Sequence, residues 1–251
     1  NVEGTLHLLR VAQNQSGRLG RAVRFVFPSS IAIYGLPSLE EKRASSRIKE
    51  EQWNLPITMY GCNKLYCEQL GRYFTHHYRQ MGALSTAARL DFRSLRFPGL
   101  ISAETVPTGG TSDFGPEMLH AAARGEPYKC FVGPDARIPF MTMPDATDAL
   151  LQLLEADKER LSTVTYNVGA FSASAGQIAE KVRKSFPKAV IDYAPDAVRS
   201  KIIDSWPEDM DDTRARTDWG WKPAYDFDRA FDEYLVPTIA KRYSITAPAE
   251  K

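Results

Sequence analysis

The sequence predicts an α/β fold in which a parallel sheet carries helices on its faces. The first observation is that helix-like and strand-like segments alternate along the first hundred residues, as in βα units. The second is that two apolar strands, Val23–Phe27 and Arg93–Phe97, each end at a proline. Ligands of such sheets bind at the carboxyl ends of the strands, so Ser30 and Pro98-Gly99 occupy candidate site positions.

The segments of this first part follow in order. Val2–Gln15 has apolar side chains at helical spacing, and residues 16–20, with two glycines, are expected to break the helix. Glu40–Pro56 is polar, charge-rich and long for a connection, so we expect a surface excursion. The helix after it is expected from Met59 to about Arg79.

Beyond Ile101 the composition changes, and a second, smaller α/β lobe is expected. Thr105–Asp113 is rich in Thr, Pro and Gly and is expected to be a loop. The expected division assigns 1–102 and 140–170 to the domain that contains the parallel sheet, and 103–139 and 171–251 to a lobe that covers the substrate. Later segments are expected as helices at 117–124, 146–156, 174–185 and 227–242, as strands at 128–132, 165–168 and 190–193, and as an Asp-rich turn at 209–213.

Composition excludes several classes of function. With 32 Lys and Arg against 31 Asp and Glu, the chain has no basic field for nucleic acid or a membrane surface. Cys62, Cys67 and Cys130 have no C-x-x-C spacing, which argues against disulfides and a metal site. No apolar run approaches the ~18 residues of a membrane span. We expect small-molecule chemistry in a reducing compartment, either the cytoplasm or the mitochondrial matrix.

Tyr60 and Lys64 are the most informative pair, because on a helix they lie one turn apart on the same face. A phenol normally titrates near pH ~10, so it acts as a base at neutral pH only where a fixed cation favours its phenolate. Lysine supplies such a cation. The pair alone is common by chance, but with Ser30 and Pro98-Gly99 in order it predicts proton transfer on an alcohol or ketone.

Four motifs occur along the chain: Asn1-Val2-Glu3-Gly4-Thr5, Pro28-Ser29-Ser30-Ile31-Ala32-Ile33-Tyr34-Gly35, Tyr60-x-x-x-Lys64 and Arg96-Phe97-Pro98-Gly99. Their order and rough spacing are those of the extended short-chain dehydrogenases/reductases. The sequence therefore resembles that group, the superfamily of NAD-dependent epimerases and dehydratases. The resemblance covers nearly the whole chain and implies a Rossmann-like, doubly wound parallel sheet that binds NAD, followed by the smaller substrate lobe.

Further segments look like those of the short-chain type of L-threonine 3-dehydrogenase. That resemblance implies oxidation of L-threonine to 2-amino-3-oxobutanoate with NAD, and a homodimer formed through helices that flank the sheet, here Val2–Gln15 and Met59–Arg79. The segments are Thr58-Met59-Tyr60-Gly61, Gly109-Gly110-Thr111-Ser112-Asp113-Phe114, Asp204-Ser205-Trp206-Pro207 and Asp218-Trp219-Gly220-Trp221-Lys222-Pro223.

One part of the expected pattern is absent from the sequence. A dinucleotide domain opens with a strand and a Gly-rich turn that brings the pyrophosphate to a helix N-terminus. Gly17-Arg18-Leu19-Gly20 follows a helix and precedes a strand, which is the wrong order, so we interpret it as a helix stop. We expect the chain to be an N-terminally truncated fragment that lacks about 70 to 90 residues, two βαβ-sized units.

The resemblance implies a role for each motif residue. Tyr60 would take the hydroxyl proton of threonine, Lys64 would favour the phenolate and bind the nicotinamide ribose, and Ser30 would hold the substrate oxygen. Alternation along the strand end favours Ser30 over Ser29, but Ser29 stays possible. The expected cofactor-binding residues are Tyr60, Lys64, Pro98, Gly99, Leu100 and Ser29, and the expected substrate-binding residues are Ser30, Tyr60, Thr111, Ser112, Asp113 and Trp206.

Alternatives remain open for several of these roles. Asp113 either contacts the substrate or caps the helix that begins near Phe114. Trp206 either lines the substrate site or only fills space in the core. Two other functions remain possible for the whole chain: a nucleotide-sugar epimerase or dehydratase of the same superfamily, or an inactive remnant without the dinucleotide-binding turn.

Overall fold

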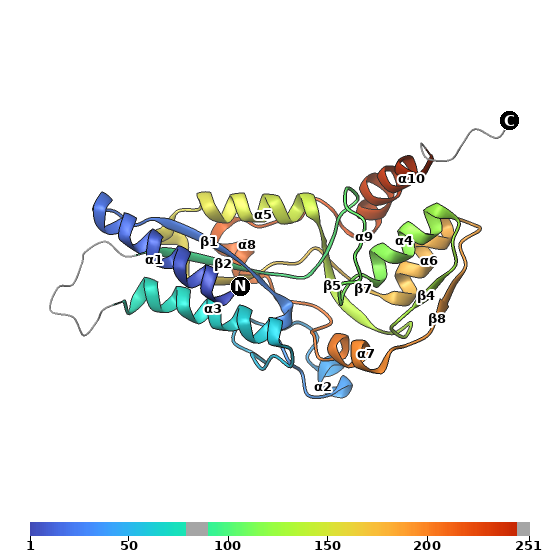
Figure 1. Cartoon of the computed structure of the whole chain (residues 1–251), viewed down its shortest axis with the longest axis horizontal. Helices are drawn as coiled ribbons and strands as arrows, with labels where there is room; N and C mark the ends of the chain where they lie inside the picture. Colours follow the sequence, from blue (N-terminus) through green and yellow to red (C-terminus); the bar gives the residue numbers. More distant parts are fainter. Residues whose placement is uncertain (79–89, 245–251) are drawn as a thin grey trace.

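A computed structural model describes residues 1–78 and 90–244, and Figure 1 shows them as two lobes side by side. The first lobe is built on a parallel sheet with the strand order β1-β2-β6, as the alternation of segments predicted. In the register of the first two strands Ser30 lies opposite Phe97, so their carboxyl ends lie at one edge of the sheet. The strands are β1 (Arg24–Ser30), β2 (Asp91–Phe97) and β6 (Thr165–Asn167).

Helices cover both faces of this sheet. On one face α1 (Val2–Leu19) and α3 (Met59–His76) pack over Phe27 and Phe92. On the other, α5 (Met143–Glu155) packs over Leu95. Because the side chains of a strand alternate between faces, a single strand supports both layers.

The ends of the first helices differ from the expectation. Helix α1 continues four residues beyond Gln15, to Leu19, and ends within the expected segment, at Gly20 with φ 64°. Gly17 is compatible with the helix because one glycine costs only about 1 kcal/mol there. Helix α3 ends at His76, and Arg79, its expected end, lies outside the described residues.

The second lobe holds two small sheets, with strand orders β3-β5-β7 and β4-β8. Helix α4 (Phe114–Arg124) packs against α6 (Ala175–Ser185) and β4, and the core of this lobe contains Phe114, Phe140 and Ile178. The strands are β3 (Gly99–Ile101), β4 (Tyr128–Cys130), β5 (Arg137–Thr142), β7 (Phe171–Ser174) and β8 (Ile191–Tyr193), and the C-terminal helical segments are α9 (Phe227–Arg229), a π-helix (Ala230–Leu235) and α10 (Val236–Ser244).

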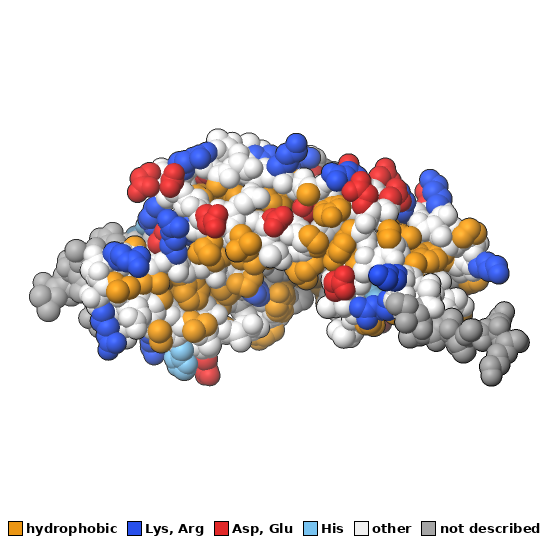
Figure 2. Space-filling view, turned by 90° about the horizontal axis from the view of Figure 1, so that it is seen from above, with side chains coloured by type: hydrophobic (Ala, Val, Ile, Leu, Met, Phe, Trp, Pro, Cys, Tyr) orange, Lys and Arg blue, Asp and Glu red, His pale blue; other side chains and the backbone are white. Residues whose placement is uncertain are grey.

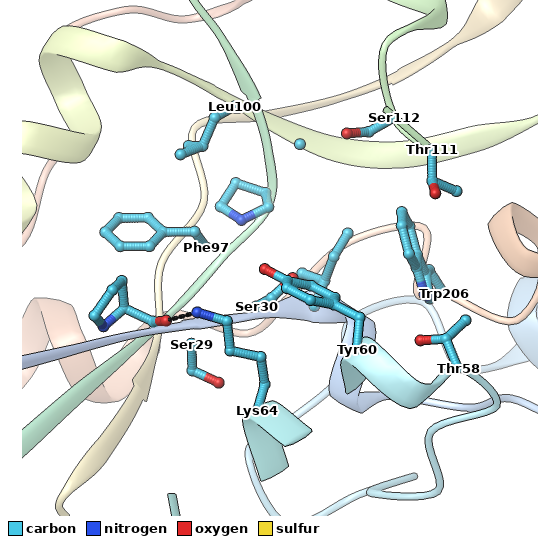
Figure 3. A pocket seen from close by; sticks show the side chains of 14 residues that line it. Ser29, Ser30, Thr58, Tyr60, Lys64, Phe97, Leu100, Thr111, Ser112 and Trp206 are labelled. Carbon is cyan, nitrogen blue, oxygen red and sulfur yellow. Dashed lines mark hydrogen bonds between the residues drawn. The ribbon is translucent and has the colours of Figure 1, made fainter. Parts of the chain in front are cut away.

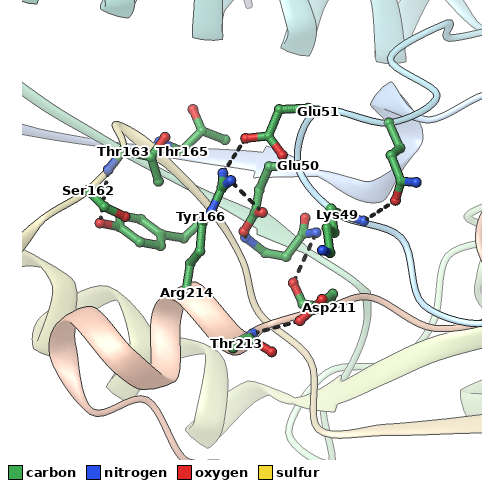
Figure 4. A network of polar contacts seen from close by, with 12 residues as sticks. Lys49, Glu50, Glu51, Ser162, Thr163, Thr165, Tyr166, Asp211, Thr213 and Arg214 are labelled. Carbon is green, nitrogen blue, oxygen red and sulfur yellow. Dashed lines mark hydrogen bonds and ion pairs between the residues drawn. The ribbon is translucent and has the colours of Figure 1, made fainter.

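The segment 40–56 lies at the surface, as its polarity suggested, but three of its side chains attach it to the rest of the fold. It contains α2 (Leu39–Ala44), and the side chains of Lys42, Ile48 and Glu50 are buried. Ile48 forms a β-bridge with Met210, and Arg214 pairs with Glu50 and Glu51 (Figure 4). The partners lie about 160 residues further along the chain, so no local sequence pattern indicates this burial.

Two short helices join the lobes and were not expected from the sequence. They are α7 (Ala197–Asp204) and α8 (Thr213–Trp219). Helix α8 packs Trp219 against Tyr166 of β6, and α7 leads directly to Ser205-Trp206. Helices of two turns carry too few apolar positions for a clear 3.6-residue period.

Apolar side chains also reach the surface. Figure 2 looks down on the side where α5 lies in Figure 1 and shows apolar side chains gathered over the middle of that face. Exposed Leu151 belongs to α5, while exposed Leu8 and Val11 belong to α1. Among the described residues, no helix combines the length and hydropathy that a membrane span needs.

Candidate active site

A pocket of about 410 Å³ opens at the carboxyl ends of β1 and β2, between the two lobes (Figure 3). It brings together segments that are far apart in the sequence. They are the end of β1, the first turn of α3, the link from β2 to β3, the loop before α4, and Trp206 after α7. Of the residues that sequence reasoning selected, those that line it are Ser29, Ser30, Tyr60, Lys64, Pro98, Gly99, Leu100, Thr111, Ser112 and Trp206.

Sequence reasoning assigned no role to four further lining residues. Pro28, Ile31 and Phe97 are neighbours of predicted residues and complete the apolar wall. Thr58 precedes α3, and its Oγ1 accepts the N–H of Gly61 at 3.0 Å, so it caps the helix. A threonine at this place is an ordinary N-cap signal, and it agrees with the helix start at Met59 that the sequence predicted.

Gly61 sets how closely α3 approaches the end of β1. A Cβ at this position would lie 2.0 Å from Ala32 O, so only glycine permits the contact between the first turn of α3 and the segment after Ser30. The contact places Tyr60 beside Ser30 at the pocket, as Figure 3 shows.

Lys64 is nearly buried, with 9% of its surface exposed. Its ammonium donates a hydrogen bond to Pro28 O and lies 5.6 Å from the centre of the Tyr60 ring. Burial lowers the pKa of Lys64, whereas the neighbouring Cys67 and Glu68 act in the opposite direction. The cation that the sequence predicted for the phenol therefore lies beside it, held by the backbone of β1.

The two serines face different surroundings. Ser29 Oγ donates to Glu68 Oε1 at 2.5 Å, and its side chain is buried. Ser30 is only partly buried, and its Oγ accepts the N–H of Ala32 at 3.2 Å, which leaves the hydroxyl proton available to a ligand. In Figure 3 the Ser29 hydroxyl lies below β1, while Ser30 lies next to Tyr60.

A buried polar network supports this end of the sheet. Arg96 on β2 forms two hydrogen bonds with the Glu68 carboxylate, at 2.9 and 2.7 Å, and one with Tyr34 Oη at 2.9 Å. Tyr34 Oη in turn donates to Asn167 Oδ1 at 2.6 Å, and burial raises its pKa to about 12. The network joins β1, α3, β2 and β6 and holds them in one register.

The second lobe contributes Thr111, Ser112 and Trp206 to the pocket. Only 7% of the surface of Trp206 is exposed. No hydrogen-bond partner of its Nε1 occurs among the described residues. A buried indole N–H without a partner is unusual and suits an acceptor on a ligand.

Asp113 occupies the expected N-cap position of α4, but its side chain makes neither of its two expected contacts. It is absent from the residues that line the pocket, and its side chain makes no capping hydrogen bond to α4. Instead, Oδ2 accepts the N–H groups of Gly110 at 2.7 Å and Thr108 at 3.3 Å. The carboxylate therefore stabilises the loop that carries Thr111 and Ser112.

The donors in this pocket fit one end of the cofactor that the resemblance implies. Tyr60, Ser30 and Lys64 supply two hydroxyls and an ammonium, and the chain from Pro98 to Leu100 supplies backbone groups beside them. That set suits a nicotinamide and its ribose. No Gly-rich turn for a pyrophosphate lines the pocket, and in the described part of the chain no group of three or more His, Cys, Asp or Glu could hold a metal ion.

Comparison with known proteins gives consistent matches. Residues 1–169 match the model of the NAD dependent epimerase/dehydratase family. The mitochondrial L-threonine 3-dehydrogenase of Bos taurus is 38% identical over 228 residues, which are 91% of this chain and 55% of that protein. An uncharacterized epimerase/dehydratase of Staphylococcus haemolyticus is 35% identical over 243 residues, 96% of this chain and 70% of that one.

Among solved structures, the holo form of the GalE-like L-threonine dehydrogenase from Cupriavidus necator superposes with a TM-score of 0.78 at 33% identity. The match covers 98% of this chain and 71% of that one. The chain spans about half the length of its bovine relative. By sequence and by structure, the chain belongs to the NAD dependent epimerase/dehydratase family.

Proposed function

We propose that the protein of which these 251 residues form part or all oxidises L-threonine to 2-amino-3-oxobutanoate with NAD. One observation carries the proposal. The proton-transfer residues of the first lobe, Tyr60, Lys64 and Ser30, share one pocket with Thr111 and Trp206 of the second. Relatives named as L-threonine 3-dehydrogenases support the choice of substrate.

In this proposal Tyr60 accepts the proton of the substrate hydroxyl. The Lys64 ammonium, close to the Tyr60 ring, stabilises the phenolate that must exist beforehand. Ser30 donates its hydroxyl hydrogen to the substrate oxygen and holds it toward Tyr60. NAD, when bound, would supply the acceptor for the hydride of the carbon that bears this oxygen, and the backbone from Pro98 to Leu100 would hold its nicotinamide.

The polar ends of the amino acid would meet the second lobe. The free Nε1–H of Trp206 suits a carboxylate oxygen, and the hydroxyls of Thr111 and Ser112 can accept hydrogen bonds from an ammonium group. Asp113, which the sequence also proposed for this role, would act only by shaping the loop.

The test measures NADH formation that depends on L-threonine, using the 251-residue chain and, where the gene encodes residues before Asn1, the same chain with them. Tyr60→Phe should lower kcat/KM by about 10²-fold or more, because general-base catalysis contributes that much. Tyr66→Phe is the matched control, since Tyr66 lies on the same helix, is exposed and does not line the pocket. Undiminished oxidation by the Tyr60→Phe protein would refute the assignment.

The second candidate is a nucleotide-sugar epimerase or dehydratase, which the names of the staphylococcal relatives favour. Uridine diphosphate sugars in the same assay decide between them: turnover of a sugar and none of threonine favours the second. The third candidate, a chain without activity, predicts neither NAD binding nor turnover by the 251 residues alone.

The proposed domain division, 1–102 with 140–170 against 103–139 with 171–251, can be tested by limited proteolysis. Cytoplasm and mitochondrial matrix stay the two proposed compartments.

We also propose a homodimer formed through α1 and α3. Leu8 and Val11 on α1 are 59% and 56% exposed, and α3 carries exposed Tyr66 and Tyr73. Light scattering after gel filtration should give twice the mass of the chain. Leu8→Glu with Val11→Glu should give the mass of one chain, whereas Leu151→Glu on α5 should leave the dimer intact.

A further inference from the structure

Arg199 holds the loop that carries Thr111 and Ser112. Its Nη2 donates to the carbonyl oxygens of Gly110 at 2.8 Å and Gly109 at 3.3 Å. Asp113 binds N–H groups of the same loop, so the loop is held at its carbonyls by one residue and at its amides by another. Of Asp113 and Arg199, only Arg199 belongs to a different element, α7.

The position of Arg199 is itself well determined. Its guanidinium carbon lies 3.2 Å from the centre of the Phe131 ring, at stacking distance. The backbone N–H of Asp196 donates to Phe131 O at 2.9 Å, and the Asp196 side chain caps α7 by accepting the N–H groups of Val198 and Arg199. The first turn of α7 is thus attached to the end of β4.

The other end of α7 leads to Trp206, another residue that lines the pocket. The helix ends at Asp204, and Ser205 O accepts the N–H of Leu36 at 2.8 Å. Trp206 follows and lines the pocket near Thr111 (Figure 3). Eight helical residues span about 12 Å, so one rigid element connects the Arg199 contact to Trp206.

We propose that Arg199 is a positioning residue that sets the distance between the Thr111–Ser112 loop and Trp206, and thereby limits the size of the amino acid that the pocket accepts. The inference rests on the proposed function for its substrate class. Arg199 does not line the pocket, so it acts through the loop and does not touch the substrate.

Arginine is suited to this task because its planar guanidinium can stack on Phe131 and still donate in its own plane. Lysine keeps the charge without the planar fork. Without Arg199 the contacts of the loop with Asp113 lose the support of another element, so they open more often and the loop is free to move relative to Trp206. The backbone of the loop can rotate at Gly109, which lies at φ 88° and has the conformational freedom of glycine.

The first experiment measures amide hydrogen exchange of residues 105–114 in the 251-residue chain, without any ligand. Arg199→Met should accelerate exchange of the Thr108 and Gly110 amides about fivefold, the effect of losing two hydrogen bonds that hold the loop. Arg229→Met is the matched control, because Arg229 also donates to a backbone carbonyl and lies over an aromatic ring, that of Tyr225, but does not line the pocket. Unchanged exchange rates in Arg199→Met would refute the proposal that Arg199 holds the loop in place.

The second experiment measures kinetics with L-threonine and with 3-hydroxynorvaline, which is one methylene longer. Arg199→Met should raise the KM for L-threonine about fivefold, change kcat less than about twofold, and weaken the preference for threonine. Arg199→Lys should lie between wild type and Arg199→Met. A faster-exchanging loop with an unaltered KM and preference would refute the positioning role. Absence of all turnover in the wild type would refute the proposed function instead. The exchange result would still decide whether Arg199 holds the loop.

Discussion

Ser29 Oγ lies 2.5 Å from Glu68 Oε1, so one of two adjacent serines is directed into the protein and the other is left at the pocket. Glu68 follows Lys64 by one turn of α3 and also binds the guanidinium of Arg96. The same carboxylate therefore occupies Ser29, fixes the register of β2 against α3 and lies beside the catalytic lysine of the proposed reaction.

The two serines should respond differently to alanine. Ser30→Ala should lower kcat/KM about 10²-fold, because it removes a donor to the reacting oxygen, and should cost up to about 1 kcal/mol of stability, because the cap of the Ala32 N–H is lost. Ser29→Ala should cost about 1 to 2 kcal/mol of unfolding free energy, because Glu68 loses a buried hydrogen bond, with little effect on rate. Urea unfolding and steady-state kinetics on both variants check this. A reversed pattern would make Ser29 the substrate-binding serine.

Glu68→Gln should strongly destabilise the fold. Glu68 is 2% exposed, and glutamine would leave the Arg96 charge unpaired inside the protein. Breaking a buried pair from one side costs about 3 to 5 kcal/mol, and for a chain of this size the melting temperature should fall by roughly 10 °C. Glu233→Gln breaks an exposed pair with Arg229 and should leave the melting curve in place. Equal curves for the two variants would show that the buried pair contributes nothing.

Gly61→Ala should disrupt the candidate site. Its Cβ would lie 2.0 Å from Ala32 O, a backbone atom that cannot move aside without shifting the end of β1. We expect a loss of about 2 kcal/mol or more of stability, as for overpacking, together with loss of activity. Gly17→Ala is the control in α1, because nothing lies within 4 Å of its added Cβ, and it should stabilise by up to about 1 kcal/mol. Calorimetry of both proteins measures the difference.

Lys42 should make the unfolding free energy depend on pH in the alkaline range. Burial lowers its pKa from the ordinary 10.5 to about 8, against opposing contributions from Asp204 and Glu208. Between these values the unfolded chain binds more protons than the folded one, so the contribution of Lys42 to stability increases as the pH rises from 8 to 10.5. From pH 7.5 to 10, wild type should gain about 2 kcal/mol relative to Lys42→Met, measured by urea unfolding at each pH. A constant difference would place the pKa of Lys42 at its ordinary value.

The fold was predictable where the signal is local. Alternating apolar segments gave the parallel strands β1 and β2 and the helices α1 and α3, with errors mainly at their ends. In the segment 40–56, polarity predicted the surface position but not the buried residues, because residues such as Lys42 and Ile48 are single positions among polar ones. Lys42 is buried because it donates to Ile203 O at 2.9 Å, a partner that no local window contains.

The candidate site shows the same division. Tyr60, Lys64 and Ser30 could be selected from the sequence because spacing on one helix and position at a strand end already constrain them. The different orientations of Ser29 and Ser30, the role of Asp113 and the free Nε1 of Trp206 depend on the three-dimensional contacts of each side chain. Arg199 could not be selected at all, because only the tertiary structure brings it to Gly109 and Gly110.

The sequence by itself determined the α/β class, the family resemblance and the residues for proton transfer, since these depend on periodicity and on motifs a few residues long. Only the tertiary structure decided which side chains meet. Hydrogen bonds and close packing act over a few ångströms, and folding brings within that reach residues such as Ser29 and Glu68, which are 39 positions apart.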